Sequence, residues 1–399
     1  MYQINDSCVY VKGAKNGAIY DFRSGKVYSI NHLACDILDR YISDEKDPCD
    51  EKYLSKLHQN NLISENYKPI VFISEPVKDT GLEVAWIEIT HICNLRCVHC
   101  YEGEYHSSTG STLTLKEWKG IIDQLEQLRT NRLIIIGGEP CCSPYVSEII
   151  SYSSNKSMDI TLFTNGTLMN NELINTIIRS KIRVKLSVYG PTPYVHDSVT
   201  RISGSYDKMV STVKKLVNAG VKVSAAVIVM KENENFADET VKFCNSIGMR
   251  CSRYDVIREV FGGSQSDHLP LNNEILRKVY FTKPNFIADK IQFMKNIDRN
   301  SCWYGKIAIK ENGDVIPCEF ERDFIYGNAK DESLFNIINN DRVKSMWLWD
   351  FSKVNGCADC EFRFACKDCR PLGKGVSGEL NTKNPRCLYD SHAGVWKCL

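Results

Sequence analysis

Three cysteines stand within eight residues of this chain, at Cys93, Cys97 and Cys100. A cubane iron–sulfur cluster has four irons, each of which is usually held by a thiolate. Three thiolates would hold three irons and leave the fourth open to a small chelating ligand. Zinc is the alternative, because it also binds thiolates, but it requires four ligands in a closed structural site. The triplet alone leaves both interpretations open.

Two further turns have residue types that suit a ligand site. Gly137-Gly138-Glu139-Pro140 directly follows an apolar run at 133–136 that is typical of a buried strand. Its glycines permit close backbone approach, and Glu139 supplies an acceptor. Thr164-Asn165-Gly166 follows the next predicted strand and is, on its own, a turn signal.

A second group of cysteines lies toward the C-terminus, at Cys302, Cys318, Cys357, Cys360, Cys366, Cys369, Cys387 and Cys398. Two Cys-x2-Cys pairs within this group, starting at Cys357 and Cys366, fit a zinc ribbon when taken alone. The other cysteines outside both groups are scattered, and we expect buried structural thiols there.

Composition limits the function classes. The chain has 399 residues, 18 cysteines and a formal net charge of +1, which gives no argument for nucleic acid or an anionic membrane. The N-terminus lacks the basic and apolar regions of a secretory signal, and no stretch approaches the ~20 apolar residues that span a bilayer. We expect a cytoplasmic protein without nucleic-acid or membrane partners, whose clustered cysteines bind metal.

Residues 83 to about 260 alternate between strand and helix patterns. Thr114 is expected to cap a helix that runs through Leu128. Strands are predicted at 84–89, 133–136, 159–163, 184–188, 221–227 and about 249–256. Six strands with helical crossovers predict an α/β fold whose parallel sheet curls into a partial (β/α)6 barrel. Ligand sites in such folds lie at the carboxyl ends of strands, which is where the triplet falls.

The first 75 residues have a different pattern. Strands are predicted at 9–11, 18–22 and 27–30, and the last two form a hairpin. Asn31 is expected to cap a helix with apolar residues at helical spacing: Leu33, Ile37, Leu38 and Ile42. A second helix at 51–59 would place Leu54 and Leu57 inward, and segment 64–82 has the composition of a linker.

The triplet and the Gly-Gly-Glu-Pro turn resemble those of the radical S-adenosylmethionine (SAM) enzymes. The resemblance implies that SAM chelates the open iron and that an electron from the cluster cleaves it to methionine and a 5′-deoxyadenosyl radical. Gly137, Gly138, Glu139 and Pro140 would hold the methionine amino group. The resemblance also implies SAM contacts for Asn165, Ser187 and Arg201. His196 recurs in peptide-modifying members, although a packing or capping role is an equal alternative.

The C-terminal array resembles the seven-cysteine SPASM domain of enzymes that modify peptides and proteins. The resemblance implies two auxiliary [4Fe–4S] clusters, and therefore three clusters in all. Cys302, Cys318 and Cys369 would hold the first auxiliary cluster. The second would take four ligands: Cys357, Cys360, Cys366 and Cys387. Cys398 could complete the first cluster, or that cluster could keep an open iron.

The N-terminal unit resembles the winged-helix-like domain that binds leader peptides in maturases of ribosomally synthesised peptides. The implied organisation is a recognition domain at 1–75, a barrel at 83–290 and a SPASM domain at 296–399. The implied function is hydrogen abstraction from a precursor peptide, with a flavodoxin or ferredoxin as electron donor. A cysteine thioether, as in sactipeptides and ranthipeptides, is the first choice of product. The alternatives are a carbon–carbon crosslink, an epimerisation, a sulfatase-maturase activity, or a non-catalytic electron-transfer or peptide-binding role.

Overall fold

The computed structural model describes residues 1–45, 47–64, 66–73, 81–100, 112–259, 266–280, 286–299 and 301–399. Two compact units divide the chain. The first combines three segments, Met1–Asp79, Tyr280–Tyr304 and Trp347–Leu399, and the second combines Thr80–Val279 with Gly305–Met346. The three domain boundaries expected from the sequence stay predictions. None of the helices among the described residues is long and apolar enough to cross a membrane.

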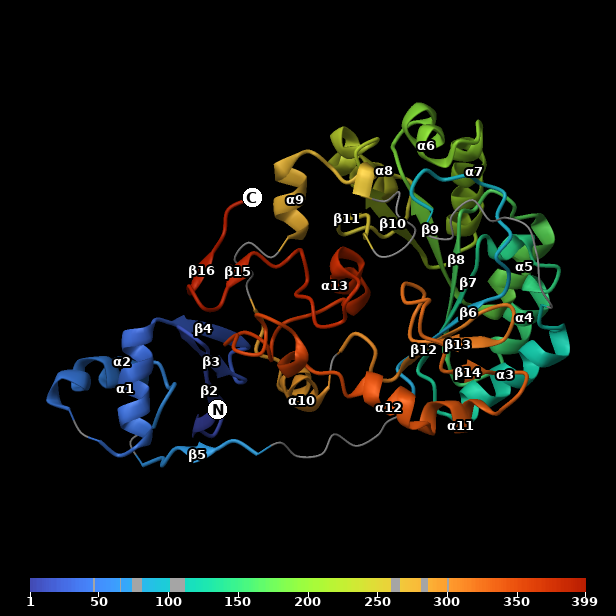
Figure 1. Ribbon diagram of the computed structural model, residues 1–399. Coiled ribbons are helices and arrows are strands. Elements are labelled where there is room, and N and C mark those ends of the chain that lie inside the picture. Colours follow the sequence, from blue (N-terminus) through green and yellow to red (C-terminus); the bar gives the residue numbers. More distant parts are fainter. Residues whose placement is uncertain are drawn as a thin grey trace. The chain divides into compact units, whose positions relative to one another are not determined.

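The second unit is built on one large sheet in the order β11-β10-β9-β8-β7-β6-β12-β13-β14 (Figure 1). The six predicted strands are all present and parallel: β6 (Val84–Glu88), β7 (Arg132–Ile136), β8 (Asp159–Thr164), β9 (Arg183–Val188), β10 (Val223–Val229) and β11 (Asp255–Val256). The α/β fold is therefore confirmed. The sixth strand is shorter than predicted, because only a single bridge at Arg250 and the two residues of β11 pair with β10.

Three strands that the sequence reading did not identify extend this sheet beyond β6. β12 (Lys306–Ile309) runs parallel to β6, and the antiparallel strands β13 (Asp314–Ile316) and β14 (Gly327–Asn328) follow it. The turn between β12 and β13 carries Glu311, which contacts the triplet loop described below.

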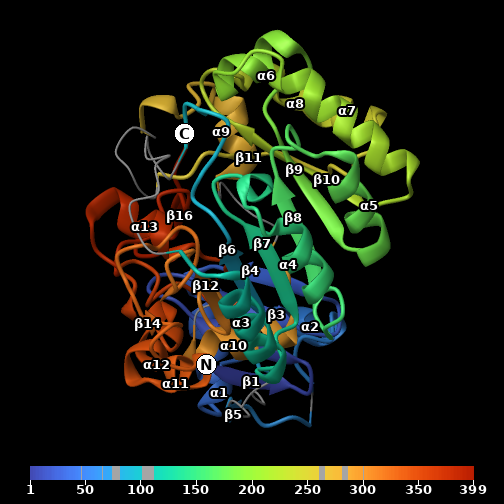
Figure 2. The same ribbon diagram turned by 90° about the vertical axis from the view of Figure 1, so that its right-hand side faces the viewer.

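Helices between the strands cover one face of this sheet (Figure 2). They are α3 (Leu115–Gln127), α4 (Val146–Ser153), α5 (Asn171–Ser180), α6 (Pro193–Thr200), α7 (Ser205–Asn218) and α8 (Ala237–Ser246), with the short turns η2 (Pro140–Cys142) and η3 (Glu234–Phe236). Thr114 caps α3 as predicted, and Glu117 completes a capping box. Further along lie η4 (Ser266–His268), α9 (Asn273–Val279), α11 (Leu334–Asn339) and α12 (Asp341–Trp347).

The first unit contains an antiparallel sheet in the order β4-β3-β2-β1-β5. The predicted strands appear as β2 (Cys8–Lys12), β3 (Gly17–Asp21) and β4 (Lys26–Ile30). Two strands were missed, β1 (Tyr2–Asn5) and β5 (Ile70–Val71). The linker prediction is wrong at β5, where the chain forms an edge strand of the sheet. A two-residue strand shows no periodic pattern in the sequence, which is why it was not predicted. Residues 74–80 of the predicted linker lie outside the described residues.

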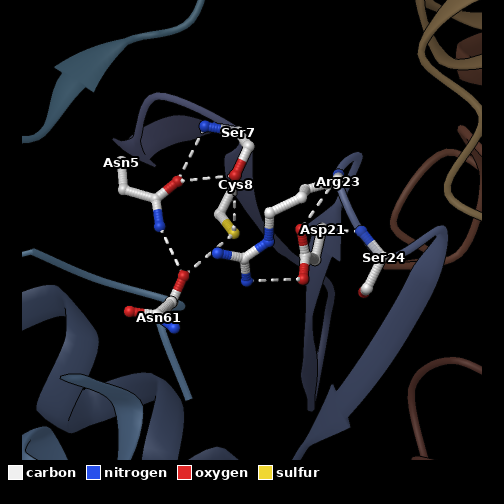
Figure 3. Close-up of polar contacts among 7 residues, drawn as sticks. All are labelled: Asn5, Ser7, Cys8, Asp21, Arg23, Ser24 and Asn61. Atoms are coloured by element: carbon white, nitrogen blue, oxygen red, sulfur yellow. Dashed lines mark hydrogen bonds and ion pairs between the residues drawn. The ribbon is translucent and has the colours of Figure 1, made fainter. Parts of the chain in front are cut away.

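Side-chain hydrogen bonds close the connections of this sheet (Figure 3). Asn5 accepts from the backbone N–H of Ser7 at 2.7 Å and donates to the carbonyl of Asn61 at 2.7 Å. Asp21 accepts from the backbone N–H groups of Arg23 at 3.0 Å and Ser24 at 3.3 Å in the β3–β4 turn. The hairpin predicted there is thus held by an Asx-type turn.

Two helices cover one face of the N-terminal sheet. α1 (His32–Ile42) is capped by Asn31, as predicted, and α2 (Glu51–Gln59) follows the short turn η1 (Pro48–Asp50). Leu38 and Leu57 are buried, and Leu54 packs partly against the same core. Leu33 was expected on the apolar stripe but is 60% exposed. The small residues Ala34 and Cys35 are buried against the sheet instead, and Cys35 packs so closely on Gly17 that a Cβ atom there would lie 2.8 Å from its sulfur.

The opposite face of this sheet is covered by residues from the C-terminal part of the chain. The shared core contains Val9, Val11, Ala18, Tyr20, Ala288, Phe293, Phe362, Phe364 and Tyr389. The residues that cover the sheet come from three places: around α10 (Lys290–Asp298), the loops between η5 (Phe351–Lys353) and α13 (Arg370–Ser377), and the hairpin of β15 (Tyr389–Asp390) and β16 (Val395–Trp396). The N-terminal sheet and the cysteine-rich segment therefore bury their apolar surfaces against each other.

Tyr20 makes the most specific contact in this shared core. Its fully buried ring meets Phe293 edge-on at 4.8 Å, and its hydroxyl donates to the carbonyl of Glu361 at 2.7 Å. Tyr20→Phe should destabilise the first unit by about 1–3 kcal/mol, because a buried carbonyl loses its donor. Urea unfolding of the full-length protein measures this loss.

The matched control is Tyr194→Phe, since Tyr194 on α6 is 84% exposed. It should leave the unfolding free energy within about 0.5 kcal/mol of the wild type. Equal stabilities for the two variants would contradict the role given to the Tyr20 hydroxyl.

Candidate active site

The cysteine triplet lies in the loop that leaves the carboxyl end of β6, as predicted. Two backbone groups of the loop bind the end of α6. The N–H of Arg96 donates to Thr200 O and the N–H of Val98 donates to Val199 O, each at 3.0 Å. The backbone N–H of His91 donates to the Glu311 carboxylate at 2.8 Å. The loop is therefore held from both sides by the chain itself.

The three thiols lie close enough to influence one another electrically. Burial raises the pKa of the Cys93 thiol to about 11 and that of Cys97 to about 12, and the neighbouring cysteines add to both shifts. Thiols in this state are not reactive nucleophiles. A bound metal would have the opposite effect on the pKa, because its positive charge deprotonates a coordinating thiol. Three partly buried free thiols on one loop are the type of donor that an iron–sulfur cluster takes.

Close backbone contact explains the glycines of the turn after β7. The N–H of Gly138 donates to Thr90 O, and the N–H of Glu139 donates to Ile92 O, both at 2.8 Å. A Cβ atom at Gly138 would lie 2.3 Å from the carbonyl oxygen of His91, which no packing tolerates. The glycine permits the β6 and β7 loops to touch.

Glu139 is 1% exposed and is bonded within the protein. Its carboxylate accepts from the Thr164 hydroxyl at 2.6 Å, the Asn165 N–H at 2.7 Å and the Cys141 N–H at 3.2 Å. Burial raises the pKa of this carboxyl, and these three donors oppose the shift. The turn after β7 is thereby joined to the turn after β8, while Pro140 starts η2.

Asn165 reaches the triplet loop directly. Its side-chain amide donates to the Asn94 side chain at 2.9 Å and lies 4.0 Å from the Cys93 sulfur. Asn94 in turn donates to the Thr167 hydroxyl at 2.8 Å. The structure thus brings together the triplet, Gly137 to Pro140 and Asn165.

Ser187 and Arg201 differ in their placement. Ser187, the last residue but one of β9, is half-buried. Arg201 directly follows the α6 residues that hold the triplet loop, but it is exposed, with a left-handed φ of 55°. Among the described residues no hydrogen bond or ion pair joins Arg201 to the triplet, so a SAM contact for it stays a prediction.

Tyr189 is a site residue that the sequence reading missed. It is 7% exposed, and its ring meets His99 of the triplet loop edge-on at 4.9 Å. The available signal was an aromatic residue directly after the fourth strand, at the edge where ligand sites lie. His196, which is 1% exposed, accepts from the Tyr189 N–H through Nδ1 at 3.3 Å. Burial lowers the pKa of His196 to about 4.

Four cysteines of the C-terminal array line one pocket in the first unit. Cys357, Cys360, Cys366 and Cys387 share it with aromatic residues that include Phe362 and Tyr389. Burial and the neighbouring thiols raise the pKa of Cys357 to about 12. Asn296 of α10, a residue not predicted, donates to the carbonyls of Phe364 at 3.1 Å and Cys366 at 3.0 Å. These four sulfurs are the set expected for the second auxiliary cluster, and they fit a four-thiolate centre.

The three cysteines expected at the first auxiliary cluster fall in both units. Cys302 accepts from the N–H of Arg370 at 3.3 Å, and Cys369 directly precedes that residue, so these two belong to the first unit. Cys318 lies in the second unit, after β13, and is 7% exposed. Cys398 is exposed near the C-terminus.

Comparison with known proteins assigns these elements. Residues 87–244 match the radical SAM superfamily, and residues 302–370 match the SPASM iron–sulfur cluster-binding domain. The chain carries a radical SAM domain and a SPASM domain. It is an enzyme whose cofactors are SAM and more than one [4Fe–4S] cluster.

Individual relatives are more distant. An AdoMet-dependent heme synthase from Methanosarcina barkeri is 25% identical over 77% of this chain and 96% of its own length. The subtilosin biosynthesis protein AlbA of Bacillus subtilis is 27% identical over 75% of this chain and 69% of its own length. The crystal structure of Streptococcus suis SuiB bound to the precursor peptide SuiA matches 98% of this chain and all of that one, with a TM-score of 0.59 and 14% identity. This last likeness shows the fold alone.

The contact between the β6 and β7 loops can be tested by adding one methyl group. Gly138→Ala should displace the triplet loop and lower the iron content of anaerobically reconstituted protein by about a third, if one of three cubanes is lost. Iron and sulfide analysis measures this loss.

Gly120→Ala is the matched control, because no atom lies within 4 Å of a Cβ built at this position in α3. It should keep full iron content and gain up to about 1 kcal/mol of helix stability. Full iron in both variants would contradict the packing role of Gly138.

Proposed function

We propose that this enzyme is a maturase of a ribosomally synthesised peptide. The observation that carries the proposal is the set of hydrogen bonds that gathers three loops at the carboxyl edge of the parallel sheet around Cys93, Cys97 and Cys100. When bound there, the cluster and SAM supply hydrogen-atom abstraction. AlbA, a bacteriocin biosynthesis protein, and SuiB, solved with a precursor peptide, support a peptide as the substrate.

The residues of the site divide the work in this proposal. The triplet holds the SAM-binding cluster. SAM is held by Gly137, Gly138, Glu139, Pro140, Asn165, Ser187 and Arg201. Because Glu139 already bonds three donors of the chain, its contribution to SAM binding is largely that of fixing the loops that line the site. The auxiliary clusters take Cys302, Cys318 and Cys369, and the four thiols of the lined pocket.

A cysteine thioether is the product we propose. It requires a place that holds the peptide thiolate beside the carbon attacked, and an auxiliary cluster with three chain thiolates would offer one open iron. Cys398 is the competing fourth ligand, and it is exposed. A carbon–carbon crosslink and an epimerisation use the same hydrogen abstraction and are the alternative products.

Heme synthesis is a second candidate, because several relatives bear that name. The heme synthases and AlbA match similar shares of this chain, 77% and 75%, so coverage does not separate the two candidates. The N-terminal sheet favours the peptide, because an edge strand is suited to binding an extended chain.

Among the described residues β4 and β5 form the two edges of the N-terminal sheet, and we propose that β4 binds the leader of the precursor. Its first residue, Lys26, already bridges to Ile287, and Gly25 O accepts from Ala288 N–H at 2.9 Å. In an antiparallel strand the backbone N–H and C=O groups of every second residue point to the same side. The backbone groups of Val27 and Ser29 therefore point away from β3, on the side where Gly25 O binds Ala288. Leader main chain would pair there, beside the exposed Leu33 of α1. A flavodoxin or ferredoxin would supply electrons, and a cytoplasmic location stays a prediction.

The reaction is tested with the short Cys-bearing peptides encoded by reading frames next to this gene. Incubation of reconstituted enzyme, SAM and reductant with the right peptide should stimulate release of 5′-deoxyadenosine and yield a peptide lacking two hydrogens. A Cys→Ser peptide should give no such product, and Cys93→Ala/Cys97→Ala/Cys100→Ala enzyme should cleave no SAM. A porphyrin product in place of a modified peptide would reject the proposal.

The leader site is tested by removing one backbone donor. Ser29→Pro should weaken precursor binding roughly 3- to 10-fold, the value of one hydrogen bond of about 0.5–1.5 kcal/mol, while SAM cleavage without peptide stays unchanged. Ser29→Ala keeps the N–H and is the control. Fluorescence anisotropy with labelled precursor gives both affinities, and equal affinity in the two variants would reject leader binding at β4. Deletion of the N-terminal segment is unsuitable, because it would uncover Phe293 and Phe362.

A further inference from the structure

The turn after β8 is fixed at Gly166. Its φ of 74° lies in the left-handed region that glycine favours, and its carbonyl accepts from the Thr212 hydroxyl of α7 at 2.6 Å. Its N–H donates to the Thr164 hydroxyl at 3.0 Å. Thr167, the next residue, is thereby held in one place, with its side chain half-buried.

Thr167 closes a ring of three side-chain hydrogen bonds with Asn165 and Asn94. Asn165 donates to Asn94 at 2.9 Å, and Asn94 donates to the Thr167 hydroxyl at 2.8 Å. That hydroxyl in turn donates to the side-chain oxygen of Asn165 at 2.7 Å. Because Asn94 directly follows Cys93, the ring joins the turn after β8 to the triplet loop.

One backbone group decides the direction of the ring. The Thr167 N–H can only donate, and its acceptor at 2.9 Å is the side-chain oxygen of Asn165. The amide nitrogen of Asn165 must therefore face the triplet loop, where it donates one hydrogen to Asn94. Its second hydrogen is available to the Cys93 sulfur, which lies 4.0 Å away and also accepts from the Leu95 N–H at 3.4 Å.

We propose that Thr167 is a positioning residue of the SAM-binding cluster: its hydroxyl closes the ring that holds the Asn165 amide toward the Cys93 sulfur. A sulfur that binds iron carries no proton and can only accept hydrogen bonds. Donors at such a sulfur favour the reduced cluster and so raise its reduction potential. The inference rests on the proposed assignment of Cys93, Cys97 and Cys100 as cluster ligands, and it does not depend on which substrate the enzyme modifies.

The turn alone does not require this hydroxyl. The bond from the Thr167 N–H to the Asn165 side chain is an Asx turn, which a valine at this position would form equally well. The hydroxyl adds the bonds to Asn94 and Asn165, and these connect the turn to the triplet loop. Because the ring occupies the Asn165 side chain, the SAM contact proposed above for this residue would involve its backbone.

The test is an EPR-monitored redox titration of the full-length, anaerobically reconstituted enzyme, following the signal that SAM shifts. Thr167→Val removes the hydroxyl but keeps the shape of the side chain and the Asx turn. It should keep the full iron content and lower the potential of this cluster, because the Asn165 amide is no longer held toward Cys93. Thr167→Ser keeps the hydroxyl and should have the wild-type potential.

Thr161→Val is the matched control. Thr161 lies earlier on β8 and is half-buried like Thr167, but its side chain makes no hydrogen bond within the described part of the chain. This variant should leave the potential unchanged. An unchanged potential in iron-replete Thr167→Val, or an equal shift in Thr161→Val, would overturn the inference.

Three further outcomes are decisive. If Thr167→Val cannot hold iron, Thr167→Ser decides the matter: wild-type iron content and potential in that variant support the role of the hydroxyl, and any other result overturns it. If the wild type shows no signal that responds to SAM, the assignment of the triplet fails, and the role of Thr167 fails with it. An enzyme that shows this signal but modifies no peptide would reject the proposed substrate and leave the titration of Thr167→Val as the test of this inference.

Discussion

The buried carboxylate of Glu139 joins the loops at the carboxyl ends of β7 and β8. A charge withdrawn from water is costly unless hydrogen bonds replace its hydration, and Glu139 receives three from the turns after β7 and β8. Its own N–H reaches Ile92 in the triplet loop, and Asn165 continues the connection to Asn94. The cysteines are thus positioned by contacts within the protein, which fits a site that binds its cofactor without large rearrangement.

The first unit depends on a different constraint, a sheet covered on both faces. All five residues of β3 are buried, as expected for a strand between two layers. One layer is α1 with α2, and the other includes Phe293, Phe362 and Phe364. The apolar surface of the N-terminal segment is therefore completed by residues near the other end of the chain.

The sequence predicted the features that depend on periodic apolar residues or on a single local residue type. Six strands followed from apolar runs, and the caps at Asn31 and Thr114 followed from residue type, because both signals act within a few residues. The missed strands β1 and β5 are too short to show a periodic pattern. Helical spacing alone placed Leu33 on the apolar stripe, whereas Ala34 and Cys35 are the residues that pack against the sheet. Tyr189 was missed because its partners His99 and Asn233 come together with it only in the folded chain.

The pocket lined by four cysteines has a consequence for the assembly of the enzyme. Cys360 and Cys387 pack against the core that also contains Val9, Val11 and Tyr20 of the N-terminal sheet. Metal binding to a site that exists only in the folded state adds its free energy to folding. Iron loading and the rigidity of the sheet proposed to bind the leader are then thermodynamically linked. A chain emptied of iron should be a poor receptor for its peptide, so maturation of the enzyme would precede recognition of the substrate.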